Sequence, residues 1–275
     1  MSFALRKSAN GKNTSKTYTI TGGTQVGTTQ FHSFQDFSVP TGNTAHFDSL
    51  LTTTNVIGRV TGSNISNIDG ILKTNGSTNL YLINPNGIIF GAKAKLDIAG
   101  SFTASTANSI KFSDGSEFSA TNPQAPPLLQ VTIPLGLQYG KSNVGATITN
   151  SGSLEVGQDL VLNADKLDLQ GRLQSARDLT LQAQDSISII NGVLSTSTSS
   201  SSVRNAGNIT INAGSLYLNN SSISANTFGK GNAGNIIINV ADSIKFDGKS
   251  SAASQVAPQT GIGNAGGVRA TAHVS

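Results

Sequence analysis

Asn205-Ala-Gly-Asn-Ile-Thr-Ile-Asn-Ala-Gly-Ser-Leu-Tyr-Leu218 returns further along the chain as Asn232-Ala-Gly-Asn-Ile-Ile-Ile-Asn-Val-Ala-Asp-Ser-Ile-Lys-Phe246. Each copy opens on the same Asn-Ala-Gly-Asn corner and then holds two short segments in which apolar and polar residues alternate. Such alternation is typical of a half-buried β-strand. A third copy begins at Asn264-Ala-Gly-Gly-Val268. The copies therefore predict a repeated structural unit built from short strands.

The same pattern extends toward the N-terminus, where apolar pairs also follow Asp159 and Asp178. The units start at residues 159, 178, 208 and 235, so they are spaced by 19, 30 and 27 residues. A period of this size with alternating strands inside it indicates a solenoid. A coil of about 19 residues can hold three short strands with tight corners between them. The longer coils carry insertions, Ser195–Ser202 and Ala225–Gly231, which we expect to project from one face.

In such a solenoid each strand pairs with its copy one coil later, at a spacing of about 4.8 Å. Ile, Leu and Val then fill the interior in columns, and Asn205, Asn232 and Asn264 occupy equal corner positions where we expect an amide ladder. No segment has a helical apolar period, and the 30 glycines suit tight turns rather than helices. The prediction is an all-β chain folded as a β-helix with almost no helix.

The stretch Leu80-Tyr-Leu-Ile-Asn-Pro-Asn-Gly-Ile-Ile-Phe-Gly91 places two apolar runs around a four-residue turn. Proline fixes its own φ, and Asn86 and Gly87 accept positive φ most easily. Taken alone, the stretch is either a hairpin with Asn-Gly at its tip or a corner in a stack of strands. The coil period favours the corner, with Ile83 and Ile89 contributing to the interior column.

The N-terminal part is expected to close the first coil. Bulky apolar groups are needed there, and we expect the cluster of Phe31, Phe34, Phe37 and Phe47 to form the core of a cap. The predicted organisation is a disordered polar tail or a cloning remnant over 1–16 and one β-helical domain over 17–275. Within it we expect the cap and first coils at 17–58, motif-bearing coils at 59–120, an extrahelical excursion at 121–140, and regular coils at 141–275. The repeat stops in mid-coil at residue 275, so the natural protein is expected to be longer.

The excursion is predicted from Asn122-Pro-Gln-Ala-Pro-Pro127, because prolines lack the amide donor that a sheet interior needs. The next segment, Leu128–Ile133, resumes as a strand that must be buried, which favours a loop or hairpin packed on the main body over a domain linker.

Several kinds of chemistry are not expected. The chain has no cysteine, and His32, His46 and His273 lack metal-ligand spacing, so no cofactor or metal is predicted. The net charge of +4 is not organised with aromatic residues as a nucleic-acid site would be. No apolar run has bilayer-spanning length, so stable membrane insertion is not expected. The first residues lack a signal-peptide core, so an exported protein would have lost its leader.

An enzyme is also not expected. Polysaccharide-cleaving β-helices need several carboxylates converging on one groove. The equivalent positions on consecutive coils are instead mixed: they are Lys166, Asp168, Ser186, Ser188 and Lys245. Neither a nucleophile elbow nor a phosphate-binding glycine loop is present.

Several motifs resemble the secretion domain of two-partner-secreted exoproteins, the filamentous-haemagglutinin-like adhesins, in a spelling similar to cyanobacterial members. The motifs are Phe31-His-Ser-Phe34, Phe37-Ser-Val39, Arg59-Val-Thr-Gly62, Ile68-Asp-Gly70 and above all Leu82-Ile-Asn-Pro-Asn-Gly-Ile-Ile-Phe-Gly91. The resemblance is strongest over residues 17–120. Many such domains carry a second motif, Asn-Pro-Asn-Leu, which this chain lacks; Ser63-Asn-Ile-Ser-Asn67 stands at a plausible equivalent place.

The resemblance implies a right-handed, single-stranded parallel β-helix with an N-terminal β-cap and small extrahelical hairpins or sheets. It implies a secretion signal that the POTRA domains of an outer-membrane β-barrel transporter recognise in the periplasm. The chain would cross that pore unfolded and nucleate β-helix folding outside, so the protein would be secreted or displayed on the cell surface. The residues that the resemblance assigns to partner recognition are Asn84, Pro85, Asn86, Gly87 and Ile88.

Two other functions remain open at the level of the sequence. The fragment could be an adhesin scaffold that binds cell surfaces or glycans directly, or a carbohydrate-active β-helix enzyme. The residues at 84–87 are also what a sharp turn alone demands, through backbone order and satisfied backbone groups. A role in the turn and a role in recognition are therefore both compatible with the motif.

Overall fold

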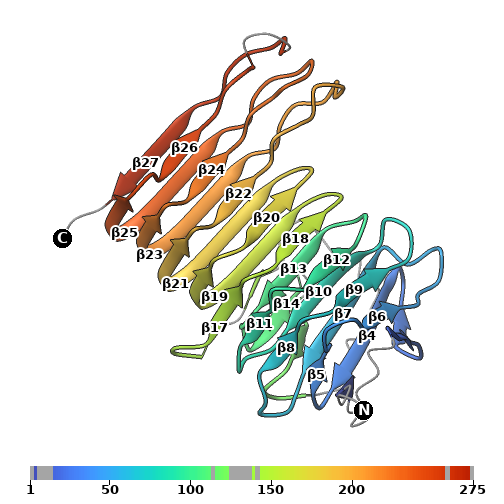
Figure 1. Ribbon diagram of the computed structural model, residues 1–275. Helices are drawn as coiled ribbons and strands as arrows, with labels where there is room; N and C mark the ends of the chain where they lie inside the picture. Colours follow the sequence, from blue (N-terminus) through green and yellow to red (C-terminus); the bar gives the residue numbers. More distant parts are fainter. Residues whose placement is uncertain are drawn as a thin grey trace.

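The protein is an elongated stack of β-strands. The computed structural model describes residues 3–4, 15–112, 115–123, 138–139, 143–257 and 261–272, and this part of the chain holds 27 strands and no helix. Figure 1 shows the strands side by side in one row, from β4 and β5 at one end to β27 at the other. The predicted all-β fold is confirmed.

A sheet of 13 strands, the long wall, covers one side of the later coils and divides at β19 into two rows on the earlier coils. Its strands are β3 (Thr24–Val26), β4 (Thr29–Phe34), β7 (Asn55–Val60), β8 (Ser66–Ile68), β10 (Asn79–Ile83), β11 (Ile88–Phe90), β13 (Phe102–Ser105), β17 (Thr147–Asn150), β19 (Leu160–Leu169), β21 (Leu179–Ile190), β23 (Ile209–Asn219), β25 (Ile236–Asp247) and β27 (Val268–Ala272). Each pairs in parallel with its copy in the next coil, except that β3 and β4 are antiparallel.

Two shorter sheets form a second wall. The first contains β2 (Thr17–Ile20), β6 (Thr44–Phe47), β9 (Ile71–Thr74) and β12 (Lys95–Asp97). The other contains β18 (Ser153–Val156), β20 (Arg172–Ser175), β22 (Val193–Ser195), β24 (Ser222–Ser224) and β26 (Ser251–Ala253). Two small sheets complete the set. In one, β1 (Phe3–Ala4) pairs with β5 (Phe37–Ser38), which belongs to the first coil because the next residue, Val39, bridges Ile68 of β8. In the other, outside the coils, β14 (Ser109–Lys111) lies between β15 (Glu117–Ser119) and β16 (Gln138–Tyr139).

The repeat unit differs from the prediction in one respect. The two apolar pairs that follow Asp159 and begin at Lys166 were expected to be separate strands with a turn between them, but they form the single strand β19. Its register to β21 shifts between Ala164 and Lys166, which is a bulge rather than a corner. The reason is that Ala164 stays fully buried, so the chain continues along the wall instead of leaving it.

Interior columns hold successive coils together. One column runs through Leu80, Phe102, Leu160, Leu179 and on through Ile209 and Ile236, and none of these side chains is exposed. Each fully buried side chain of this kind contributes roughly 1.5–3 kcal/mol. Because the repeated apolar positions meet in register, every added coil extends the same core.

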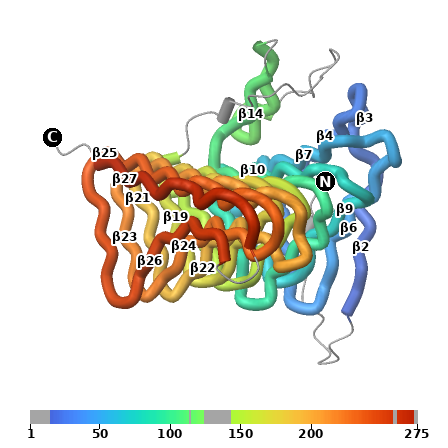
Figure 2. Tube along the Cα trace, turned by 90° about the horizontal axis from the view of Figure 1, so that it is seen from above, coloured from blue at the N-terminus to red at the C-terminus, as the bar shows by residue number. Residues whose placement is uncertain are grey.

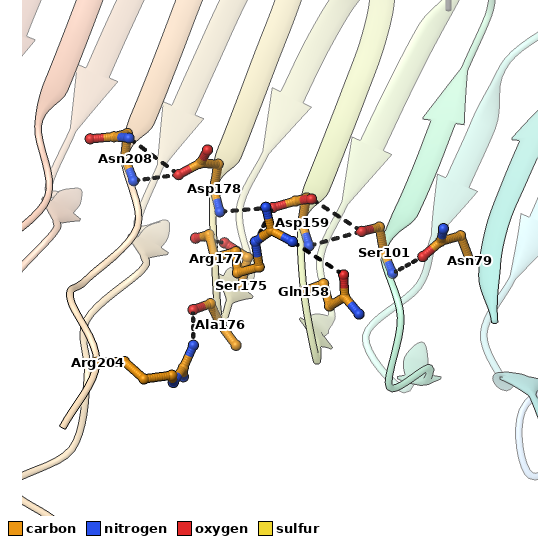
Figure 3. A network of polar contacts seen from close by, with 10 residues as sticks. All are labelled: Asn79, Ser101, Gln158, Asp159, Ser175, Ala176, Arg177, Asp178, Arg204 and Asn208. Atoms are coloured by element: carbon orange, nitrogen blue, oxygen red, sulfur yellow. Dashed lines mark hydrogen bonds and ion pairs between the residues drawn. The ribbon is translucent and has the colours of Figure 1, made fainter. Parts of the chain in front are cut away.

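A polar ladder follows the edge where each strand of the long wall begins, and Figure 3 shows its central part. Asp159 Oδ1 accepts a hydrogen bond from the Asp178 backbone N–H at 3.1 Å, and Asp178 Oδ1 accepts one from the Asn208 N–H at 2.8 Å. Asn208 Oδ1 in turn accepts from the Asn235 N–H at 2.9 Å. The polar residue that precedes each strand therefore satisfies the first backbone donor of the next coil.

One rung of this ladder can be tested directly. Asp178→Ala is expected to lower the free energy of unfolding by about 1 kcal/mol, because the Asn208 N–H loses its acceptor. Asp178→Asn keeps an acceptor oxygen and should stay near the wild-type value in urea unfolding. The matched control is Asp168→Ala, an exposed position on the same wall. Equal losses at positions 168 and 178 would contradict the role of the ladder.

The insertions of the longer coils stack on one another. The Thr198 N–H donates to the Asn226 carbonyl at 3.0 Å, and the Thr227 N–H donates to the Gln255 carbonyl at 2.9 Å. The two threonine hydroxyls lie 2.9 Å apart and are buried. The loops after β22, β24 and β26 extend from the same side of the stack (Figure 1). The insertions therefore widen the later coils instead of standing free as separate loops.

The N-terminal end of the interior is closed by polar and aromatic side chains. Gln30 and His32 of β4 stand in register with Val56 and Gly58 of β7, so they occupy the first level of two interior columns. Around them, Phe34, Phe37 and Phe47 are buried, with ring centroids of Phe34 and Phe37 5.0 Å apart. Phe31 does not join this group, because neighbouring residues of a strand face opposite sides and Phe31 points out of the coil.

His32 gives this end a pH dependence. Its ring stacks on Phe34 at 5.9 Å and meets Phe47 edge-on at 5.7 Å, and its buried Nε2 has no hydrogen-bond partner in the described structure. Burial lowers the pKa of His32 from its usual 6.5 to about 4. The folded state thus favours the neutral ring. The contribution of His32 to the free energy of unfolding is therefore fully present above pH 6.5 and is lost as the pH falls toward 4.

We expect the free energy of unfolding to fall by up to about 3 kcal/mol between pH 7 and pH 4 because of His32. Denaturant unfolding at a series of pH values measures this slope. His32→Phe removes the titrating group and should flatten the slope, whatever its offset at pH 7. An unchanged slope in the variant would show that His32 does not titrate in this range.

The extrahelical sheet begins earlier than predicted. Residues 109–119 were assigned to the coils, but β14 and β15 form an antiparallel pair outside them, and β14 stands off the stack in Figure 2. Ile110 and Phe118 of this pair pack on the outer face of the long wall with Phe31, Ile57 and Ile83. The prediction for 121–140 lies mostly outside the described residues, as do His273 and most of the 1–16 tail.

Candidate recognition site at the Asn84–Gly87 corner

The four-residue turn at 84–87 joins β10 to β11. Strand β10 pairs with β7 and β13, whereas β11 pairs with β8 and β17. The two flanking strands therefore belong to one coil and do not pair with each other. The stretch is a corner, as the coil period favoured, and not a hairpin.

The corner sets which residues face the interior. Leu82 and Ile88 lie in the main core, and Phe90 follows two residues later. The prediction that Ile83 and Ile89 line the interior column is wrong. Ile83 is buried beneath the extrahelical sheet on the outer face, and Ile89 is 38% exposed. Side chains alternate along a strand, so Leu82 pointing in forces Ile83 out.

Asn84 is completely buried and its side chain is fully bonded. Its Nδ2 donates to the Asn64 carbonyl at 3.0 Å and to Ser66 Oγ at 2.9 Å. Its Oδ1 accepts from the backbone N–H of Asn86 at 3.0 Å and from Asn86 Nδ2 at 2.9 Å. The backbone N–H of Asn84 donates to the Ser105 carbonyl at 2.9 Å. This one side chain therefore ties the corner to the preceding coil and closes the turn.

The rest of the corner is held from both sides. Asn86 Nδ2 also donates to the Gly62 carbonyl at 2.8 Å, and Asn143 Nδ2 donates to the buried Pro85 carbonyl at 3.0 Å. Gly87 has φ of 122°, and a Cβ there would lie 3.0 Å from the Thr147 carbonyl oxygen. Only glycine meets both conditions without strain. The corner is thus locked between the coil before it and the coil after it.

The segment Ser63–Asn67, where the second family motif was expected, supplies part of this lock through Asn64 and Ser66. Neither residue, nor Asn143, was predicted as part of the site. The sequence indicated only that these Asn and Ser residues stand at corners, because Asn and Ser occur at corners throughout the chain. The pairing between corners of different coils depends on register, which one sequence does not specify.

The three asparagines expected to form a corner ladder lie in the C-terminal coils, away from this site. Asn205 Oδ1 accepts from the Asn232 backbone N–H at 2.8 Å, and Asn232 Oδ1 accepts from the Asn264 N–H at 2.9 Å. The structure therefore places them in a side-chain-to-backbone series rather than an amide-to-amide stack.

The described residues contain no group of three His, Cys, Asp or Glu side chains that could hold a metal ion. Within the same residues no helix is long and apolar enough to cross a membrane. Lys166 pairs with Asp185 at 3.2 Å across an exposed face, an arrangement of little energetic weight.

Comparison with known proteins identifies relatives. A family model described as the TPS secretion domain matches residues 4–267. The heme/hemopexin-binding protein of Haemophilus influenzae is 27% identical over 168 residues, which cover 56% of this chain and 17% of that protein. The chain thus corresponds to a small part of the length of this relative.

A solved structure shares the fold. The crystal structure of the HMW1 secretion domain from Haemophilus influenzae superposes with a TM-score of 0.56, covering 90% of this chain and 71% of that chain at 18% identity. The parallel β-helix predicted from the repeats matches this neighbour.

Proposed function

Because the chain belongs to the family of TPS secretion domains, we propose that it is the N-terminal secretion-signal domain of a large exported, adhesin-like protein. The POTRA domains of an outer-membrane β-barrel transporter recognise it in the periplasm, and its coils nucleate β-helix folding outside the cell. The protein then stays on the cell surface or is released. The family is one of secretion domains and not of enzymes.

The corner that spans three coils is the observation that supports this proposal most. The motif residues at 84–87 bond backward to Gly62, Asn64 and Ser66, and forward to Asn143. A coil can therefore be locked as soon as its two neighbours have left the pore. Nearest-neighbour stacking of this kind lets folding begin at one end and propagate.

The absence of cysteine is compatible with export of an unfolded chain. The chain has no cysteine, so no disulfide can form while it waits unfolded in an oxidising compartment. The strands of the long wall bond mainly to the preceding and following coils, as the registers of β19, β21 and β23 show. Sequential emergence from a pore supplies these partners in the order in which they are needed.

Direct binding tests recognition. The 275-residue chain should be captured by its cognate outer-membrane transporter in detergent solution, and capture should be lost when the POTRA domains are deleted from that transporter. A transporter of an unrelated secretion system is the control. Equal capture by both transporters, or capture that survives the deletion, would contradict the proposal.

A further inference from the structure

Three consecutive coils pass the level of the motif corner in three different ways. The first makes the turn at 84–87 between β10 and β11. The second leaves the stack after β13, carries the extrahelical strands β14 and β15, and enters β17 through residues 143–146, which we call the return turn. The third runs straight on as β19, with Asp165 in its bulge. The return turn bonds to the motif corner on one side and to Asp165 on the other.

The bonds of the return turn connect these two sides. Asn143 Nδ2 donates to the Pro85 carbonyl at 3.0 Å. The Gly145 N–H donates to Asp165 Oδ2, and the Asp165 N–H donates to the Ala146 carbonyl at 3.2 Å. The turn closes on itself through the Ala146 N–H, which donates to the Asn143 carbonyl at 3.0 Å. Asp165 therefore fixes the turn from which Asn143 reaches the corner.

The packing of coils does not by itself require a buried carboxylate at this place. Asp165 is 7% exposed, and burying a carboxylate costs free energy unless its oxygens are bonded. In the next coil Gln184 and Asp185 of β21 stand opposite this bulge, and both are exposed. The buried carboxylate thus accompanies the return turn, whose backbone it binds.

We propose that Asp165 is a positioning residue that latches the motif corner. By holding the return turn, it keeps Asn143 on the Pro85 carbonyl, and so it secures the corner from a coil that is not its neighbour. A hydrogen bond from a backbone N–H to a carboxylate is among the stronger kinds in proteins, which suits this role. The inference concerns the folded domain and does not rest on the proposed function.

The latch makes the stability of the corner depend on the order of the coils. Asp165 follows both the corner and the return turn in the chain. In a stack that grows from its N-terminal end, Asn143 reaches the Pro85 carbonyl first, and the return turn is fixed only when β19 is added. The forward bond of the corner therefore reaches its full strength only with the third coil.

Native-state hydrogen exchange of the 275-residue chain tests the latch. Two amides report on the corner, because the Gly87 N–H donates to the Asn84 carbonyl and the Ser66 N–H donates to the Gly87 carbonyl, both at 3.1 Å. In Asp165→Ala we expect both amides to exchange at least about tenfold faster than in wild type. Asp165→Asn keeps an acceptor oxygen and should bring the rates back to within about threefold of wild type.

Two further variants separate the path from general destabilisation. Asn143→Ala cuts the same path at an exposed residue, so the double variant with Asp165→Ala should exchange at the corner no faster than Asp165→Ala alone. Asp178→Ala is the matched control, because Asp178 also accepts a backbone N–H from the following coil but belongs to the polar ladder. It should leave the Gly87 and Ser66 amides within about threefold of wild type.

Wild-type exchange of the Gly87 and Ser66 amides in Asp165→Ala would overturn the proposal, because the corner would then hold without the latch. Equal acceleration at the corner and throughout β23 would also overturn it, since the loss would be global and not carried by the return turn. If Asp165→Ala fails to fold, Asp165→Ser takes its place, because its shorter side chain sets the oxygen farther from the Gly145 N–H. The same two outcomes decide the proposal for that variant.

Discussion

Asn84→Leu is expected to lower the free energy of unfolding by about 3–5 kcal/mol, the largest effect of any single polar substitution that we predict. The leucine fills the volume of the fully buried Asn84 side chain but leaves the buried Ser66 hydroxyl, the Asn64 carbonyl and the Asn86 N–H without their partners. Each stranded buried group costs roughly 1–3 kcal/mol. Urea unfolding followed by circular dichroism measures the change.

The control for this substitution is Asn67→Leu, a neighbouring asparagine with an exposed side chain on the same wall. Its expected change is within about 0.5 kcal/mol. If the two leucine variants lost the same stability, the corner would not be the lock that its hydrogen bonds indicate.

Arg59→Met is expected to release the extrahelical sheet from the coil and to cost about 2–4 kcal/mol. Arg59 is 4% exposed, and its guanidinium lies 4.0 Å from the centre of the Phe118 ring. Its Nη1 donates to the Ser119 carbonyl at 2.8 Å, and its Nε donates to Ser33 Oγ at 2.8 Å. Burial lowers the pKa of Arg59 to about 10, so the group remains charged at neutral pH.

Hydrogen exchange distinguishes local release from general loss of stability. Amides of β14 and β15 should exchange much faster in Arg59→Met, while those of β19 and β21 keep their protection relative to wild type. Arg172→Met is the matched control, because that arginine is exposed and its partners, Gln174 and Glu155, lie on the surface of the second wall and not in the extrahelical sheet. Uniform acceleration across all four strands would mean that Arg59 does not act as a local clamp.

The interior of the C-terminal coils was predictable because the sequence repeats there. Leu160, Leu179, Ile209 and Ile236 occupy equal places in their units, and the structure puts them in one column. The long strands were not predicted, since a few residues between two apolar pairs can make either a corner or a bulge. Burial of Ala164 decides between them, and burial is a property of the stack.

The site was predictable only in part. The turn at 84–87 follows from proline, asparagine and glycine chemistry, but the bonds from Asn84 to Asn64 and Ser66 depend on the register between coils. Arg59 was expected only as part of a family motif, because a charged residue in a strand normally faces water. Ile83 was predicted to face the interior because it is apolar. It faces outward instead and is buried because the extrahelical sheet covers it.

Export of a reporter tests the central claim most directly. Residues 1–275, preceded by a periplasmic leader and followed by an epitope-tagged reporter, are produced with and without the cognate outer-membrane transporter. The account predicts reporter in the medium or on the cell surface only when that transporter is present, and retention in the periplasm otherwise. Equal release in both strains would contradict it.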